Sequence, residues 1–335
     1  MPELPEVETV RRGLVTALGL GLRPTGGEEL DGSSLPRVEE WHFCRETLRY
    51  PLPIDRLRAL EGRRLLAVER RSKYLLLYFG TAPSVWGESA LAHVTARVLI
   101  HLGMTGVLRV LRQVPELAKH DHLWLRLGTE NRDFYLLYND VRRFGFWDIQ
   151  AWEELSGEEA QFSRTGPEPI PLEVYREQAP LSLALSLAIS GTSSRPALPG
   201  DGLAGHLYRA SRKVGRELKS WLLEGKAVCG VGNIYCSESL WLAGLSPYRK
   251  AHSLAESEAG DLAVAVQQTI SAAIKAGGTT LKDFRSTDGK PGYFRQELKA
   301  YGRAGEPCLR ANCTGRIERK MQAQRATFCC PICQN

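Results

Sequence analysis

The crowding of cysteines at one end constrains this 335-residue chain more than any other feature. Five of its 8 cysteines lie in the last 28 residues, and four of them form two short pairs separated by sixteen residues. Two such thiolate pairs brought together by a hairpin suit a tetrahedral zinc ion. We therefore predict one structural Zn²⁺ bound by Cys308, Cys313, Cys330 and Cys333. Four thiolates leave no open coordination position, so we expect no catalytic metal.

Two alternatives stay open at these cysteines. They could be reduced and unliganded, or Cys329 could replace Cys330 as a ligand, although the two-residue spacing to Cys333 favours Cys330. A segment this small has little core, so bound metal would supply much of its folding energy. In a cytosolic chain of this size, clustered cysteines indicate metal binding rather than disulfides.

The pattern of residue types changes along the chain. Short runs of β-forming residues punctuated by Gly, Asn and Asp recur over about 35–150, whereas helical stretches follow a proline-rich connection at 164–173. We predict an α+β multidomain protein: an N-terminal antiparallel β-sandwich with an N-terminal helix (1–160), a helical domain (161–288), and a C-terminal region with a β-hairpin zinc finger (289–335).

Charge and hydropathy exclude a membrane protein. The longest apolar candidate, Leu181–Ser190, is too short to span a bilayer, and acidic residues interrupt the N-terminus where a signal peptide needs an apolar core. We therefore expect a cytoplasmic protein. The net charge of +6 is compatible with a nucleic-acid partner, but many other proteins are equally basic.

The N-terminus, MPELPEVETVRRGL, predicts a helix over 3–18 and raises a chemical possibility. Once Met1 is removed, Pro2 is a free secondary amine that can attack an aldehydic sugar carbon and form an iminium. The positive end of a helix disfavours the protonated amine, and Glu3 beside it could carry protons. The alternative is that Pro2 only begins the helix.

Two glycine-containing motifs carry candidate DNA contacts. GVGNIY (230–235) lacks the third glycine and βαβ context of a dinucleotide fold, so we predict a turn whose N–H groups face a phosphate, with Asn233 as helix cap, phosphate contact or both. DVRRFG (140–145) and HLGMTG (101–106) place Phe144 and Met104 on loops where they could wedge between bases. Taken singly, side chains of these two types are more often core residues.

Basic residues lie within the hairpin, between the two cysteine pairs. Such residues often reach phosphate oxygens, although a solvated charged face is an equal alternative. They are Arg316, Arg319, Lys320 and Arg325.

Read in order from residue 2 to residue 334, these motifs resemble the bacterial formamidopyrimidine-DNA glycosylase family. The segments that carry the resemblance are PELPEVETVRRG, RRSKYLLL, HLGMTG, KHDH, RRFG, GPEPI, GVGNIYCSESL, GGTTLKDFRSTDGKPGYF and the terminal cysteines. The resemblance implies a bifunctional base-excision repair enzyme. It would flip oxidised purines, such as 8-oxoguanine and formamidopyrimidines, out of the duplex, remove the base, and nick the strand by β,δ-elimination.

The resemblance also implies roles for individual residues. Pro2 would be the nucleophile, Glu3 the proton donor, Glu6 a neighbour in the site, and Lys73 would steady the phosphates and assist the chemistry. Phosphate contacts would come from His101, Asn233 and Arg325, and the hole left by the flipped nucleotide would be filled by Met104, Arg142 and Phe144. The segment 284–294 would be a mobile loop over the extruded base.

The wider organisation follows from the same resemblance. The helical middle would be a helix-two-turns-helix module, and the tail a zinc finger. The expected protein is a monomer, its partner is duplex DNA containing oxidised purines or abasic sites, and its location is the bacterial cytoplasm in association with the nucleoid.

Several positions depart from the family pattern. Val141 replaces the proline usual before RRFG, which loosens that loop, and the first cysteine pair is two residues longer than usual. Cys329 stands where an aromatic residue is common. Extra segments lie at 83–92 and 181–205, and neither has a functional interpretation.

Rival interpretations differ in what they require of the N-terminus. Endonuclease VIII, which acts on oxidised pyrimidines, shares the proline and glutamate but typically opens PEGPE. A catalytically silent DNA-damage sensor would not need Pro2, Glu3 or Lys73, and all three are present. A zinc-stabilised transcription factor would need a helix-turn-helix or repeated fingers, which the sequence does not show.

Overall fold

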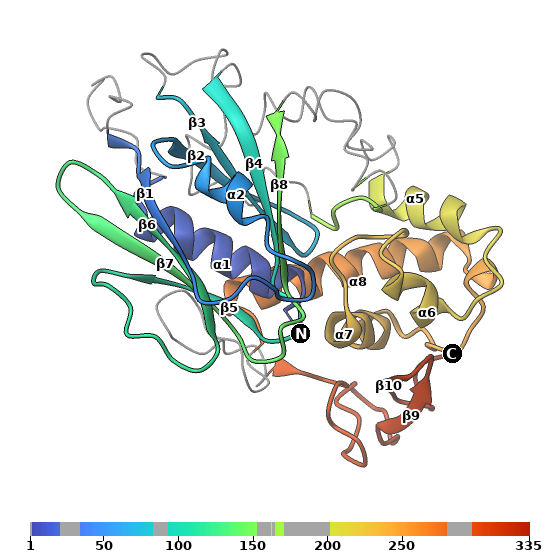
Figure 1. Ribbon diagram of the computed structural model, residues 1–335. Helices are drawn as coiled ribbons and strands as arrows, with labels where there is room; N and C mark the ends of the chain where they lie inside the picture. Colours follow the sequence, from blue (N-terminus) through green and yellow to red (C-terminus); the bar gives the residue numbers. More distant parts are fainter. Residues whose placement is uncertain are drawn as a thin grey trace, which may run out of the picture.

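The computed structural model describes residues 2–20, 34–82, 93–152, 162, 165–170, 202–279 and 297–335. Figure 1 shows a β-sheet unit, a helical unit beside it, and a small hairpin below the helices. Both predicted domain boundaries, at 160–161 and 288–289, lie outside the described residues. The same holds for the predicted loop 284–294, for 83–92 and for nearly all of 181–205.

The sheet unit is one eight-stranded antiparallel sheet in the order β5-β7-β6-β1-β2-β3-β4-β8. Its strands are β1 (Arg37–Phe43), β2 (Arg64–Arg71), β3 (Tyr74–Gly80), β4 (Val94–His101), β5 (Gly106–Leu111), β6 (Asp121–Gly128), β7 (Asp133–Asp140) and β8 (Phe146–Ala151), and helix α2 (Ile54–Arg58) lies between β1 and β2. The predicted antiparallel β-sandwich is confirmed, and its two layers belong to one continuous sheet. Only one residue pair, Arg37 with Arg64, joins β1 to β2, which leaves two four-stranded halves.

The two halves face each other across a common core. Trp147 on β8 makes edge-to-face contacts with Trp41 on β1 and Tyr138 on β7, with ring centroids 6.2 and 5.5 Å apart. These strands are far apart in the sheet order, so the contacts close one half over the other. The runs of β-forming residues seen in the sequence therefore fill a sandwich-like core.

Helix α1 (Leu4–Ala17) joins the sheet unit to the helical unit, close to the predicted range 3–18. Val7, Val10 and Leu14 are buried in the sheet core, whereas Leu4 belongs to the core of the helical unit. In Figure 1 the N-terminus lies between the two units, near α7. The first residues of the chain are therefore held at a domain junction rather than left as a tail.

The helical unit contains α5 (Gly202–Ser211), α6 (Leu218–Leu223), α7 (Asn233–Ala243), the short 3₁₀ turn η4 (Ala251–Ser253) and α8 (Glu256–Lys275). Helix α8 packs against α5, α7 and α1, so it supports the N-terminal helix from the other side. None of the described helices is long and apolar enough to cross a membrane.

The C-terminal hairpin consists of β9 (Glu318–Gln322) and β10 (Arg325–Cys329), paired in antiparallel register. It rests on α7 through a small core that includes Trp241, Ile317 and Phe328. The hairpin with its nearby cysteines agrees with the predicted zinc-finger fold.

Candidate active site

Glu3 lies buried at the N-terminus of α7, only 2% exposed. Its carboxylate accepts hydrogen bonds from the backbone N–H groups of Gly232 (2.7 Å), Ile234 (3.0 Å) and Tyr235 (3.4 Å). The positive end of a helix favours a negative group at this place. Because Pro2 directly precedes Glu3, this contact holds the chain's first residues at the start of α7.

The glycines of GVGNIY allow the first residues of α1 and the preceding Glu3 to pack closely against this turn. We expected the N–H groups of the turn to face a phosphate, but several of them face Glu3 instead. A Cβ at Gly232 would lie 2.3 Å from Cδ of Glu3, and one at Gly230, where φ is +77°, would lie 2.5 Å from the side chain of Leu4. The N–H groups of Gly232, Ile234 and Tyr235 are therefore occupied by the protein's own carboxylate.

Glu6 occupies a second buried position on α1. It accepts hydrogen bonds from the Tyr235 hydroxyl (2.5 Å), the Thr279 N–H (2.7 Å) and the Glu3 N–H (2.8 Å). Burial, and then the nearby charge of Glu3, raise the pKa of Glu6. The two carboxyl groups thus have different surroundings, which is the arrangement that separates acid and base roles.

Lys73 reaches the same region from the turn between β2 and β3. Its Nζ lies 3.4 Å from the carbonyl oxygen of Val231, just before α7. Burial lowers the pKa of Lys73, while the negative charge of Glu3 opposes that shift and the positive charge of Arg325 adds to it. The structure therefore brings the predicted catalytic residues to one junction of α1, the β2–β3 turn and α7.

The turn that carries Lys73 is held by Glu168, a residue that the sequence analysis did not single out. Ser72 has φ +56°, an uncommon conformation for a non-glycine residue, and donates its N–H to Glu168 at 2.7 Å. Glu168 also accepts from Arg70 at 2.9 Å and Arg71 at 3.1 Å. Although burial opposes ionisation, the two guanidinium groups and the N–H hold the pKa of Glu168 at about 2.

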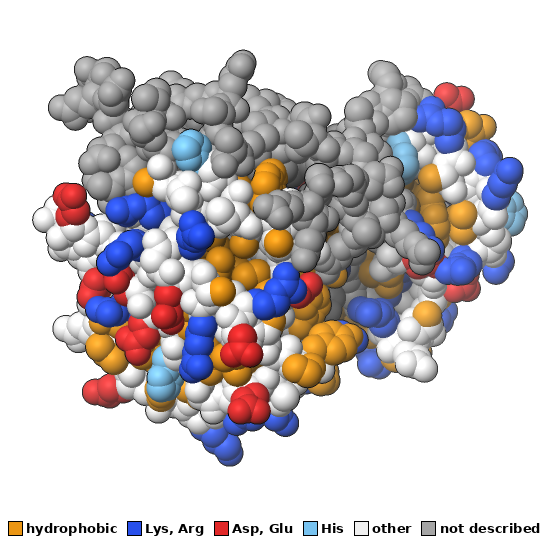
Figure 2. Space-filling view, turned by 45° about the horizontal axis from the view of Figure 1, so that its top comes forward, with side chains coloured by type: hydrophobic (Ala, Val, Ile, Leu, Met, Phe, Trp, Pro, Cys, Tyr) orange, Lys and Arg blue, Asp and Glu red, His pale blue; other side chains and the backbone are white. Residues whose placement is uncertain are grey.

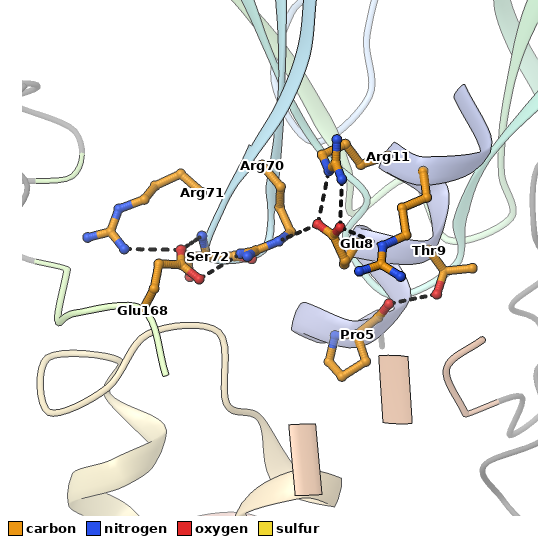
Figure 3. Close-up of polar contacts among 9 residues, drawn as sticks. Pro5, Glu8, Thr9, Arg11, Arg70, Arg71, Ser72 and Glu168 are labelled. Atoms are coloured by element: carbon orange, nitrogen blue, oxygen red, sulfur yellow. Dashed lines mark hydrogen bonds and ion pairs between the residues drawn. The ribbon is translucent and has the colours of Figure 1, made fainter. Parts of the chain in front are cut away.

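Figure 3 shows that this network continues into α1. Arg70 also donates to Glu8 at 3.1 Å, and Glu8 accepts from Arg11 and Arg12 at 2.8 and 2.9 Å. Glu168 lies in the connection to the helical unit, so these ion pairs tie three segments far apart in sequence to the base of the candidate site.

His101, a predicted phosphate contact, lies at the end of β4 in an aromatic cluster. Its ring stacks on Phe146 and lies 5.0 Å from that of Tyr74. Burial, with the charges of Lys73 and Arg49, lowers the pKa of His101 to about 4. Nδ1 accepts the N–H of Gly103 at 3.0 Å, so a neutral ring carries its proton on Nε2, available to a phosphate oxygen.

The predicted wedge residues lie on two neighbouring loops. Phe144 is 41% exposed, so it is not a core residue, and the guanidinium of Arg142 lies over its ring at 4.5 Å. Met104 is half-buried on the loop between β4 and β5. Val141, in place of the family's proline, is exposed.

Asn233 and Arg325 meet where α7 contacts the hairpin. Asn233 does not cap α7; its Nδ2 donates to the carbonyl of Ala326 at 3.0 Å, and Gly232 occupies the cap position. The buried Lys219, which sequence analysis missed, donates to the same carbonyl at 2.9 Å. Arg325, beside that carbonyl, is exposed.

The four cysteines predicted as ligands come together beside the hairpin. Their sulfur atoms all lie within 4.8 Å of one another, and Cys329 is not among them. Cys308 to Cys333 and Cys313 to Cys330 are 3.7 and 3.6 Å apart. A tetrahedral zinc ion with Zn–S bonds of about 2.3 Å requires sulfurs about 3.8 Å apart, so this cluster could hold a metal ion of that kind.

On one face of the molecule, surface charge alone does not locate a DNA interface. On the face shown in Figure 2, Lys and Arg side chains over the sheet unit are interspersed with Asp and Glu rather than gathered in one stripe. The geometry at the domain junction is the more specific signal.

Comparisons with known proteins agree with this geometry. Residues 1–147 match the family model described as "Formamidopyrimidine-DNA glycosylase N-terminal domain", and residues 202–285 match "Formamidopyrimidine-DNA glycosylase H2TH domain". Proteins named formamidopyrimidine-DNA glycosylase from Sodalis glossinidius and Marinobacter nauticus are 38% and 37% identical to this chain, with both chains covered completely.

Solved structures similar to this chain come from the same family of proteins. A Lactococcus lactis FPG variant in complex with a Fapy-dG containing DNA aligns over 100% of both chains with a TM-score of 0.75 and 27% identity. A complex between the Lactococcus lactis Fpg and an abasic site containing DNA aligns over 99% of both chains, with a TM-score of 0.74 and 27% identity. MutM in complex with carbocyclic 8-oxo-G containing DNA is similar over 100% of both chains, with a TM-score of 0.73 and 28% identity.

Proposed function

Because the chain belongs to the formamidopyrimidine-DNA glycosylase family, we propose that it is a base-excision repair enzyme that removes oxidised purines from duplex DNA and nicks the resulting abasic site. The observation that carries this proposal is the burial of Glu3 against α7, which holds Pro2 at the junction where Glu6 and Lys73 also converge.

The proposed first step is displacement of the damaged base. With Met1 removed, the Pro2 nitrogen attacks C1′ of the flipped nucleotide, the N–C1′ bond forms, and the glycosidic bond breaks. The departing base takes a proton from Glu3, and the Glu3 carboxylate then takes up the proton that the Pro2 nitrogen loses. The nitrogen lone pair next expels O4′, which receives that proton from Glu3; the C1′–O4′ bond breaks, the sugar ring opens, and the Pro2–C1′ bond becomes an iminium. The positive charge of the iminium then acidifies C2′, so that loss of a C2′ proton expels the 3′ phosphate, and a second elimination expels the 5′ phosphate.

Lys73 and the neighbouring residues act on the DNA backbone in this proposal. The Lys73 ammonium and the Nε2–H of His101 bind phosphates from the sheet side, while Asn233 and Arg325 bind from the helical unit and hairpin. The Asn233 NH₂ group has two N–H donors, so it can bind a phosphate oxygen while it keeps its bond to Ala326. Met104, Arg142 and Phe144 enter the duplex and fill the space that the base leaves.

We assign the four-cysteine cluster to a structural zinc ion. Zinc bound there would fold the hairpin and so hold Arg325 over α7. The protein's own contribution is the hydrogen-bonded support of the same hairpin by Lys219, which binds Thr327 at 2.7 Å as well as Ala326. We further propose a monomer that acts on chromosomal DNA in the bacterial cytoplasm at the nucleoid.

The test is incubation of the purified enzyme with an end-labelled duplex containing one 8-oxoguanine opposite cytosine. We expect strand cleavage that leaves phosphate at both ends of the gap. Pro2→Gly should impair the nicking step and Glu3→Gln should abolish base removal, whereas Glu130→Gln, an exposed glutamate in the β6–β7 turn, should change neither. Normal nicking by both site variants would refute the mechanism.

The same assay tests the lesion class. A duplex with an oxidised pyrimidine in place of 8-oxoguanine should be cleaved more slowly. Faster cleavage of the pyrimidine lesion would assign the protein to the endonuclease VIII type of activity instead.

A further inference from the structure

Asp140, the last residue of β7, is completely buried and receives four hydrogen bonds at its carboxylate. Its Oδ1 accepts from the Thr105 hydroxyl at 2.5 Å and the Arg142 N–H at 3.3 Å. Its Oδ2 accepts from the Gly145 N–H at 2.8 Å and the Tyr138 hydroxyl at 3.2 Å. The single carboxylate therefore links two loops to the end of a core strand.

These two loops are the ones that carry the candidate wedge. Thr105 follows Met104 on the β4–β5 loop, and the N–H donors come from the β7–β8 loop that contains Phe144. The loops also touch directly, since a Cβ at Gly103 would lie 2.4 Å from the carbonyl carbon of Phe144. Thr105 itself accepts the Arg142 N–H at 3.0 Å.

All four donors are neutral groups, so the Asp140 carboxylate is stabilised by these hydrogen bonds together rather than by one ion pair. Removing a carboxylate from water is costly unless hydrogen bonds replace its hydration. Bonds to an ionised acceptor are roughly twice as strong as neutral ones. Burial and the nearby Asp140 raise the pKa of Tyr138 well above its ordinary value, so its hydroxyl remains a donor. Moving either loop away would leave part of the charge uncompensated.

We propose that Asp140 is a positioning residue for base extrusion: it holds the Met104 loop and the Arg142–Phe144 loop in one fixed arrangement before DNA binds. This inference rests on the proposed function of those side chains as void fillers. A wedge that is already ordered does not lose conformational freedom when it enters the duplex, which lowers the cost of extrusion.

The test uses Asp140→Asn, which keeps the shape of the side chain but replaces one acceptor oxygen with an NH₂ group. That group cannot accept from the backbone N–H of Gly145 or Arg142, so the β7–β8 loop loses one of its two N–H bonds to the side chain at position 140. Asp121→Asn is the matched control, since Asp121 is also buried and accepts from the Ala118 N–H at 2.9 Å and from Asn139 at 2.8 Å. The loop that Asp121 supports carries none of the wedge residues.

Two single-turnover rates are compared for each protein: removal of 8-oxoguanine opposite cytosine, and nicking of a duplex with a preformed abasic site. An abasic site has no stacked base to extrude, so its processing depends less on the wedge. We expect Asp140→Asn to slow base removal roughly 10- to 100-fold, the factor for one or two hydrogen bonds to a charged group. The rate of abasic-site nicking by Asp140→Asn should stay within about 3-fold of the wild-type rate, because the lost hydrogen bonds support base extrusion and this substrate has no base to extrude. Asp121→Asn should alter neither rate.

Wedge insertion is measured separately from chemistry. A 2-aminopurine opposite a stable abasic analogue reports insertion by its fluorescence on binding, even if the wild-type protein removes no base. Asp140→Asn should bind this duplex but give a reduced fluorescence change. Thr105→Val should also bind this duplex with a reduced fluorescence change, but the reduction should be smaller. If Asp140→Asn does not fold, Thr105→Val takes its place in the test. Unchanged fluorescence and base removal, or an equal loss of both rates, would overturn the inference.

Discussion

Replacing Glu168 by glutamine should lower the free energy of unfolding by about 3 kcal/mol at pH 7. A carboxyl whose pKa falls from 4.5 to about 2 on folding contributes roughly 3 kcal/mol to stability when ionised, since each unit of difference in pKa corresponds to about 1.36 kcal/mol. Breaking one side of a buried ion pair independently suggests about 3–5 kcal/mol. The variant would leave Arg70 and Arg71 buried beside a neutral amide.

The same carboxyl gives the prediction a pH signature. Because its folded pKa is depressed, its contribution is fully present above the unfolded pKa of 4.5 and is lost as the pH falls toward 2. The difference between the wild type and Glu168→Gln should therefore be constant from about pH 8 to pH 5.5 and narrow by about 1.4 kcal/mol at pH 3.5.

Urea unfolding followed by tryptophan fluorescence at a series of pH values measures this difference. Glu130→Gln, which removes an exposed carboxylate of the same kind, should stay within about 0.5 kcal/mol of the wild type. A difference below about 1 kcal/mol at pH 7, or one that does not narrow at low pH, would show that Glu168 does not stabilise the fold through its charge.

Three further predictions concern other contacts. Gly232→Ala should displace Glu3, since the added Cβ would lie 2.3 Å from its Cδ, and reduce 8-oxoguanine removal at least 100-fold, about 2.7 kcal/mol, in a single-turnover assay. Cys330→Ser should reduce the zinc content found by elemental analysis while Cys329→Ser leaves it at one ion per chain; equal losses would contradict the ligand assignment. Lys219→Met should weaken binding to an abasic-analogue duplex about 10-fold in a fluorescence titration, since the hairpin loses its two charge-assisted hydrogen bonds from α6; unchanged affinity would refute that role.

The spacing of residues along the chain predicted the features that form between residues close in sequence. The cysteine spacing predicted the four sulfurs that come together, because two short knuckles on a hairpin bring their ligands close. Apolar periodicity predicted α1 within one residue at each end. The runs of β-forming residues predicted an antiparallel unit, and the family resemblance supplied its partner modules.

Contacts between residues far apart in the sequence could not be predicted from local spacing. GVGNIY looked like an anion-binding turn, and the chemistry was right, but the anion is the carboxylate of Glu3, more than 200 positions away in sequence. Asn233 bonds to the hairpin rather than capping its own helix for the same reason. Glu168 carried a weak signal, an acidic residue between prolines in GPEPI, but nothing in the sequence pairs it with Arg70 and Arg71.

Covalent trapping at the N-terminus tests the central claim most directly. The enzyme is mixed with an 8-oxoguanine:cytosine duplex in the presence of borohydride, which reduces an iminium to a stable amine, and the adduct is located by peptide mass spectrometry. We predict one cross-link, at Pro2, on a chain that lacks Met1. A cross-link at Lys73, or base removal with no cross-link at all, would contradict the account.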